Sequence, residues 1–474
     1  MKRTRLSRVG TICLFAACFG GPASGGAWDS NTLAGAAKVV ITPPSSDQGV
    51  PQYLDGAPVY MAGFDSGRAA TGVHDDLFAR AAVIDIGGTR IALVTLDLVG
   101  YMVEEVQDVR RLLPERLGVD RLIVASTHNH EGPDTMGLWG WNDDLWPFIH
   151  PGVNDLYLLT LKRKIVEAVE LAVVDLRWAG LRAATAFTDE LELIRDTREP
   201  EIIDEKLAVL QAVELGGEGE VITTLINWSS HAEVLGDENT LLTADYPGYV
   251  CSRTEEQWGG TALFIAGAVG GLMTPKVSEN TFSAARRLGH DVANLAIGAI
   301  GNVTTLEMQN RLDIRSNEDV DLFLMNPMLR LLNELWRRSF RTLHNCGPFG
   351  WFCRDLKTEV NLISIEGLMQ LITVPGEIVP ELSYDLLREL DAPNTMIVGL
   401  GNDEIGYILP VYKYRCNEED PRLCWKTAEK DFKYPDDFFD PGDHYEETVS
   451  VGPNAAPVIM NAIFDLIAEY EGGR

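Results

Sequence analysis

The stretch 81–99, AAVIDIGGTRIALVTLDLV, contains two apolar runs separated by a pair of glycines. Both runs are rich in Ile and Val, which favour strands, and a Gly-Gly pair tolerates the positive φ angles of a tight turn. This stretch therefore predicts two strands joined by a hairpin. The residues after it have helical spacing over 103–117 and then form another apolar run, RLIVAST, at 121–127.

The same alternation of helix and strand patterns continues along the chain. Amphipathic spacing predicts helices over 155–176 and 283–301, and short apolar runs predict strands at 38–44, 220–230, 261–267, 368–376 and 395–402. Alternation of this kind is typical of α/β proteins. We therefore expect mixed β-sheets flanked by helices, in a single large domain over 28–474.

The composition indicates a globular protein that does not bind nucleic acid. The chain has 474 residues, 46% of them hydrophobic, and a formal net charge of −30. A phosphate backbone repels such a chain, and so does an anionic lipid surface. Apolar contact with a membrane is still compatible with this charge, and the sequence leaves the oligomeric state open.

The first 27 residues have the pattern of an export signal. A basic start, MKRTRLSR, precedes the short apolar run VGTICLFAACFG and a segment of small residues. Alternatively, LFAAC resembles a lipoprotein box, in which case Cys18 would carry the lipid. We therefore expect an exported protein that is periplasmic, secreted or lipid-anchored at the cell envelope.

The cysteines that follow this signal predict two local disulfides. Cys346 and Cys353 are close in sequence, as are Cys416 and Cys424, and both pairs lie in loop-like surroundings. Cys251 is left as a buried thiol. Because the chain has no CxxC pair, a zinc-thiolate site is not expected.

The segment 318–356, like the charged and aromatic segment 412–444, looks like an addition to the alternating frame. Its residues 321–340, DLFLMNPMLRLLNELWRRSF, are rich in Leu and aromatic residues. Residues 321–340 predict either an ordinary core helix or a helical lid over an apolar pocket.

Polar residues suited to chemistry follow several of the predicted strands. His128 and His130 come after the strand at 121–127, His231 follows 220–230, and Glu377 and Tyr407 follow the last two strands. On an extended backbone, residues i and i+2 face the same side, so the two imidazoles of the HxH could point into one cleft. Two histidines and a carboxylate form a plausible ligand set for catalytic zinc.

Six segments, in the same order, resemble motifs of the neutral ceramidases, the non-lysosomal amidases that hydrolyse the N-acyl bond of ceramide. ASTHNHEGP is similar to their SATHTHSGP, and GLGNDEIGYI to their GLTNxYxxYI. The other four segments are YMAGFDSGRAATGVHDDLFARAAVI, INWSSHAEVL…ADYPGY, VPGE and HYEETVSVGP. The resemblance runs from about residue 38 to 470 and implies the family's catalytic domain.

The resemblance also implies roles for individual residues. It implies that zinc is bound by His128, His231, Glu377 and Tyr407, and that water activated by the zinc is the nucleophile. His130 would be a second active-site histidine, and Tyr445 would help to stabilise the oxyanion. An active-site arginine falls in LIRDTREP, where Arg195 and Arg198 are both candidates.

The segment GLMTPK, 271–276, departs from the family's GDVSPN-type hexapeptide. Thr274 stands at the position of the active-site serine, with Leu272 and Lys276 replacing an acid and an amide. Threonine keeps the hydroxyl but is β-branched and stiffer about χ1. The expected function is zinc-dependent hydrolysis of an N-acyl amide in a small lipid-like molecule such as ceramide. The alternatives are the same chemistry on another amide or ester, and an exported binding protein without turnover.

Overall fold

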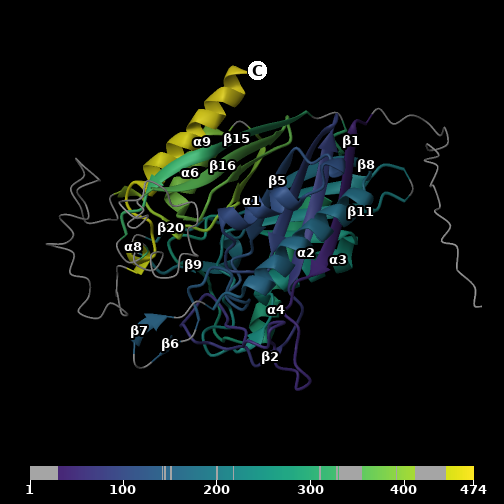
Figure 1. Cartoon of the computed structure of the whole chain (residues 1–474). Coiled ribbons are helices and arrows are strands. Elements are labelled where there is room, and N and C mark those ends of the chain that lie inside the picture. Colours follow the sequence, from purple (N-terminus) through teal and green to yellow (C-terminus); the bar gives the residue numbers. More distant parts are fainter. Residues whose placement is uncertain are drawn as a thin grey trace, which may run out of the picture.

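Two β-sheets lie face to face, with helices on the outer face of each (Figure 1). The structure is a computed structural model that describes residues 30–473 except 141, 144–145, 150–151, 199–200, 217, 309–310, 327–328, 330–354, 391 and 412–444. The first 29 residues, with the predicted signal and Cys18, lie outside the described part, as do both predicted disulfides. Cys251 is described, and it is a free and buried thiol as expected.

The larger sheet contains the hairpin predicted from 81–99. Its eight strands lie in the order β13 (Thr261–Ala266), β11 (Val221–Trp228), β10 (Lys206–Glu214), β8 (Arg177–Phe187), β1 (Thr32–Val40), β3 (Phe78–Ile86), β4 (Thr89–Leu96) and β5 (Arg121–Ser126). β3 and β4 pair antiparallel, and Gly87 and Gly88 turn between them with φ of 63° and 91°. The pairs β4–β5 and β11–β13 are parallel, so the sheet is mixed.

The smaller sheet has four strands, in the order β15 (Leu312–Phe323), β16 (Asp355–Ile365), β17 (Met369–Thr373) and β19 (Asn394–Val398). Short strand pairs lie outside the two sheets. They are β2 (Gly72–Val73) with β12 (Leu241–Leu242), β9 (Ile194–Asp196) with β14 (Met273–Pro275), β18 (Glu377–Ile378) with β20 (Tyr407–Ile408), and β6 (Asn142–Asp143) with β7 (Trp146–Ile149).

Helices cover the outer faces of the two sheets (Figure 1). Over the larger sheet lie α1 (Val103–Leu112), α2 (Asp155–Val174), α3 (Asp245–Trp258) and α4 (Phe282–Gly301), and over the smaller sheet lie α6 (Pro380–Glu389) and α9 (Ala455–Gly472). A short helix, α8 (Tyr445–Thr448), precedes α9, and two single 3₁₀ turns span Glu115–Leu117 and Asp189–Leu191. No described helix is long and apolar enough to cross a membrane.

The main core lies between the two sheets. Leu93, Leu210 and Leu263 of the larger sheet belong to one buried cluster with Leu371 and Met396 of the smaller sheet. Side chains alternate between the two faces of a strand, so the opposite face of each sheet is left for the helices. The prediction of mixed sheets flanked by helices is therefore confirmed.

Several expected elements have different bounds in the structure. The strand expected at 38–44 spans Thr32–Val40 as β1. The helix expected over 103–117 ends at Leu112 because Pro114 has no N–H and disfavours helical geometry in the residue before it. In the segment 318–356, the first residues are the end of strand β15 and not part of a helix. Most of the predicted lid, 327–328 and 330–354, lies outside the described residues.

Candidate metal centre

The HxH tripeptide lies in the loop that follows β5. His128 has φ of 60°, so the extended conformation expected for this segment is wrong. The two imidazoles nevertheless face each other, and their Nε2 atoms are 3.4 Å apart. A left-handed conformation is costly for a residue other than glycine, and such strain is often kept at functional sites.

A third histidine reaches the pair from the loop after β11. Residues Asn129 and Ala232 form an isolated parallel bridge, and the His130 N–H donates to Ala232 O at 3.0 Å. This contact joins the two loops and places His231 beside the HxH. The three buried imidazoles offer nitrogen atoms that all lie within 4.8 Å of one another, which makes the cluster compatible with a metal site.

Two of the imidazoles are held in a definite tautomer by backbone carbonyl groups. His128 Nδ1 is 2.9 Å from Val99 O, and His231 Nδ1 is 2.9 Å from Met273 O. Because a carbonyl oxygen only accepts hydrogen bonds, each Nδ1 carries the proton and donates it. The Nε2 atom of each ring is then the one that faces the other histidines, and it can bind a metal once it carries no proton.

Glu377 places a carboxylate oxygen against both of these Nε2 atoms. Its Oε2 is 3.4 Å from His128 Nε2 and 3.2 Å from His231 Nε2, and it forms no hydrogen bond with acceptable geometry to any described residue. Burial favours the neutral carboxyl, but the charges of the two imidazoles hold the pKa of Glu377 well below its usual range. A buried anionic oxygen beside the Nε2 atoms of two imidazoles fits a divalent cation, which would take the place of the protons on these rings.

The pKa of His231 determines how metal binding at this site depends on pH. Burial alone would lower its pKa, but Glu233 and Glu377 raise the pKa of His231 to about 9. A proton on this imidazole therefore balances the Glu377 carboxylate. Metal binding has to displace that proton, so metal affinity falls as the solution becomes more acidic.

Tyr407 lies beside Glu377 on a neighbouring strand. β18 and β20 pair in parallel, with Glu377 opposite Tyr407, and the Tyr407 side chain is buried. Both residues line a small pocket of about 100 Å³ together with His128 and His130. The structure thus brings the four residues that the resemblance implies as zinc ligands to one region.

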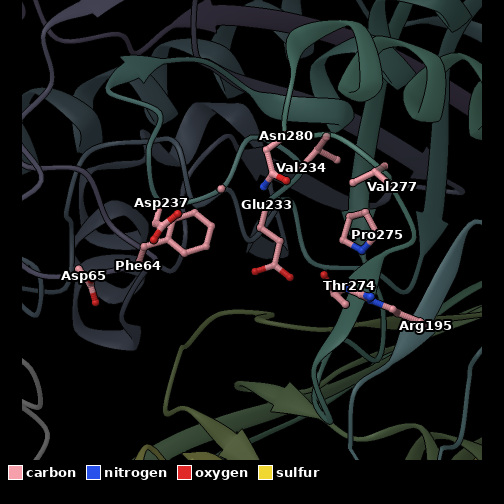
Figure 2. Close-up of a pocket in the computed structure, with 11 residues that line it drawn as sticks. Phe64, Asp65, Arg195, Glu233, Val234, Asp237, Thr274, Pro275, Val277 and Asn280 are labelled. Carbon is pink, nitrogen blue, oxygen red and sulfur yellow. The ribbon is translucent and has the colours of Figure 1, made fainter. Parts of the chain in front are cut away.

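Thr274 and Arg195 line a second pocket, which is larger and more polar than the one beside Glu377. They face each other on the paired strands β14 and β9, and the pocket has a volume of about 410 Å³. In Figure 2 the Glu233 carboxylate lies between Phe64 and Thr274. Glu233 Oε2 is 3.5 Å from His130 Nδ1, so this carboxylate connects the polar pocket with the histidine cluster.

The two candidate arginines have different surroundings. Arg195 is exposed and lines the polar pocket. Arg198 is buried and pairs with Glu381 at 2.7 Å and Asp196 at 3.5 Å. Tyr445 is the first residue of α8, and its side chain lies outside the described part of the structure.

Three residues of the site were not found by sequence reasoning. Glu233 is two residues after His231, and Glu404 stands where the motif GLTNxYxxYI has its first tyrosine, so both could have been noticed. The contact between Arg68 and His130 could not be predicted from a local pattern, because the two residues are far apart in sequence. The Arg68 guanidinium is buried, pairs with Glu131 and donates to the His130 carbonyl oxygen.

Comparison with known proteins extends this description. No protein-family model matches the sequence. Neutral ceramidase from Pseudomonas aeruginosa is 18% identical with a TM-score of 0.65, over 85% of this chain and 74% of that chain. A ceramidase complexed with C2 is 17% identical with a TM-score of 0.70, over 94% of this chain and 76% of that chain. At such identities the likeness establishes architecture and not activity. The chain has the fold of the neutral ceramidases.

Proposed function

We propose that this protein is a zinc-dependent hydrolase that cleaves the N-acyl amide bond of ceramide or a related lipid. One observation carries the proposal. Glu377 Oε2 lies 3.4 Å from His128 Nε2 and 3.2 Å from His231 Nε2. The fold, which is shared with a neutral ceramidase and a ceramidase complexed with C2, supports the amide as the substrate class.

The proposed zinc ligands are His128, His231, Glu377 and Tyr407. Nitrogen and oxygen ligands of this kind suit zinc, although a phenol is an unusual member of the set. A zinc ion held there would act as a Lewis acid on the acyl carbonyl and supply hydroxide at neutral pH.

His130 is the proposed proton carrier. Burial and the neighbouring charges of His128 and His231 hold the pKa of His130 well below its usual value, so the imidazole is neutral. Its buried Nδ1 forms no hydrogen bond to the described residues, although Glu233 Oε2 lies 3.5 Å away. The ring is therefore able to accept a proton during attack and transfer it to the leaving amine nitrogen.

The two pockets suggest how the substrate lies. The polar pocket contains Asp65, Glu233 and Asp237, whose charges favour the amine part as it gains a proton. The small pocket beside Glu377 is lined mainly by apolar side chains and suits the acyl part. Thr274, Arg195 or Arg198, and Tyr445 are the proposed positioning and oxyanion-stabilising groups.

Metal analysis combined with an amidase assay tests this proposal. Protein loaded with zinc and then desalted should retain one zinc per chain and release a fluorescent fatty acid from N-acyl-sphingosine. His128→Ala, His231→Ala and Glu377→Gln should lose both properties. His290→Ala, which changes a histidine of α4 outside the cluster, should lose neither. Zinc retention that is unaffected by the three site variants would refute the metal centre.

A different amide or ester substrate is the second candidate. The observation that favours it is the sequence GLMTPK, in which Lys276 pairs with Glu192 and Leu272 has φ of 57°. A panel of N-acyl amino acids and acyl esters separates it from the first. Retention of zinc without turnover of any acyl compound would favour a binding protein. We also propose export to the cell envelope, which detection of a processed N-terminus would test.

A further inference from the structure

Glu404 is a buried carboxyl beside the candidate metal ligands, and the mechanism above does not use it. Its side chain is 3% exposed and lines the same small pocket as His128, Glu377 and Tyr407. The remaining wall of that pocket is largely apolar and includes Val99, Met136, Leu138, Trp139, Leu329 and Ile405. Glu404 is therefore the polar group in an otherwise hydrophobic part of the pocket.

One oxygen of this carboxyl has a partner and the other has none. Glu404 Oε1 accepts a hydrogen bond from the Gly406 N–H at 2.9 Å. Glu404 Oε2 is buried and makes no hydrogen bond within the described residues. A buried polar atom without a partner is costly, and native structures keep such atoms mainly where a ligand or water completes them.

Burial of the Glu404 carboxyl favours its neutral form. Burial and the negative charge of Glu377 raise the pKa of Glu404 well above its usual range. A neutral carboxyl both donates and accepts hydrogen bonds, which matches a hydroxyl group on a ligand. A charged carboxylate in the same position would lie against the apolar wall without enough hydrogen bonds to offset its lost hydration.

We propose that Glu404 contacts the substrate and selects acyl amides that carry a hydroxyl group close to the scissile carbonyl. The inference rests on the proposed function. Because Glu404 shares a pocket of only about 100 Å³ with the candidate ligands, a hydroxyl that reaches Oε2 has to be close to a carbonyl placed at the metal. An acyl chain hydroxylated at its second carbon meets this requirement, whereas a plain hydrocarbon chain leaves Oε2 unpaired.

The kinetic test uses two N-acyl-sphingosines that differ only in a hydroxyl on the second carbon of the acyl chain. The wild-type protein should favour the hydroxylated compound by about tenfold in kcat/KM, the effect of one buried hydrogen bond. Glu404→Gln should keep part of this preference, since its amide also donates. Glu404→Leu should lose the preference and retain zinc.

A matched control is Gln370→Leu, which also replaces a buried side chain whose oxygen lacks a partner, but on β17 outside the pocket. It should leave the preference unchanged. Equal kcat/KM for the two compounds in the wild-type protein would overturn the inference while leaving the amidase function intact. Loss of zinc in Glu404→Leu would also overturn it, because Glu404 would then be a metal ligand.

A binding measurement separates failure of this inference from failure of the proposed function. Calorimetry with a 2-hydroxy fatty acid and its plain counterpart reports on the pocket without any turnover. Affinity about tenfold higher for the hydroxy acid, lost in Glu404→Leu, supports the inference even in a protein that hydrolyses nothing. Equal affinities for the two acids would contradict it.

Discussion

At the scale of single residues, the position of His130 depends on the absence of a side chain at Gly63. Gly63 has φ of 98°, and a Cβ added there would lie 2.3 Å from His130 Cγ. Arg68 supports the same loop by donating to Ala62 O at 2.7 Å and to the carbonyl of His130. His130 is thus held in place at both its ring and its backbone.

Gly63→Ala should therefore displace His130 without removing the metal ligands. We expect turnover to fall by about a hundredfold, the usual effect of misplacing a catalytic group by an ångström, with zinc content unchanged. Steady-state kinetics and metal analysis measure the two quantities. Gly67→Ala is the matched control, because Gly67 has φ of 86° but nothing within 4 Å of an added Cβ. If both variants lose turnover equally, backbone strain and not contact with His130 is responsible.

At the scale of elements, the segment 399–402 after β19 joins the two edges of the larger sheet. The Gly399 N–H donates to Ala266 O at the end of β13, and the Asn402 N–H donates to Val124 O in β5. A Cβ on Gly399 would approach Gly267 O to 2.2 Å, so the contact requires glycine. Glu404 and Tyr407 follow directly, and this contact places them beside the histidines.

Asn402 is the residue in this segment whose replacement should cost most. It has φ of 68°, its Oδ1 accepts from the Val124 N–H at 2.7 Å, and its Nδ2 donates to Glu359 Oε1 at 2.6 Å. Asn402→Ala loses both buried hydrogen bonds and strains the backbone, so the free energy of unfolding should fall by about 3 kcal/mol.

Urea unfolding at neutral pH measures this change, with Asn402→Gly as the control. Glycine lacks the same hydrogen bonds but tolerates the positive φ, so it should be more stable than the alanine variant by about 1 kcal/mol. Equal stability of the two variants would show that the positive φ of residue 402 has no effect on the free energy of unfolding.

At the scale of the whole molecule, a buried ion network connects the two sheets. Glu359 of β16 is 1% exposed. It accepts two hydrogen bonds from Arg110 of α1, at 2.6 and 2.7 Å, and one from Arg121 of β5 at 3.0 Å. Burial alone would raise the pKa of Glu359, but the hydrogen bonds and charges of these arginines lower it below its ordinary value of 4.5.

Glu359→Gln should lower the free energy of unfolding by about 3 kcal/mol at pH 7, because it leaves the partly buried Arg110 without its carboxylate and Arg121 with Glu318 alone. Since the folded pKa is lowered, the stabilisation by Glu359 is fully present above pH 4.5 and is lost as the pH falls further. The stability difference between wild type and variant should therefore shrink in acid. Unfolding measured from pH 7 to pH 3 checks this, and a difference independent of pH would contradict it.

The sequence by itself determined the local elements. Apolar periodicity predicted the hairpin at 81–99 and the helices α2 and α4, because strand and helix patterns depend on neighbours within a few residues. The sequence also showed that candidate site histidines and a carboxylate follow predicted strands. The motifs shared with the neutral ceramidases indicated the fold. The local pattern missed α3 and α9, and it gave the wrong conformation to His128, whose φ is set by contacts outside its own segment.

Tertiary structure alone decided how these elements form one site. The ends of the larger sheet curl until β13 contacts β5, and the segment 399–402 hydrogen-bonds to both strands. This arrangement brings Glu377 to His128, and it buries Glu404 in an apolar pocket where one of its oxygens has no partner among the described residues. Local pattern cannot encode such contacts, because they depend on packing between residues hundreds of positions apart. The two histidines of STHNHEGP form, with His231, a cluster compatible with a metal site only in this folded arrangement.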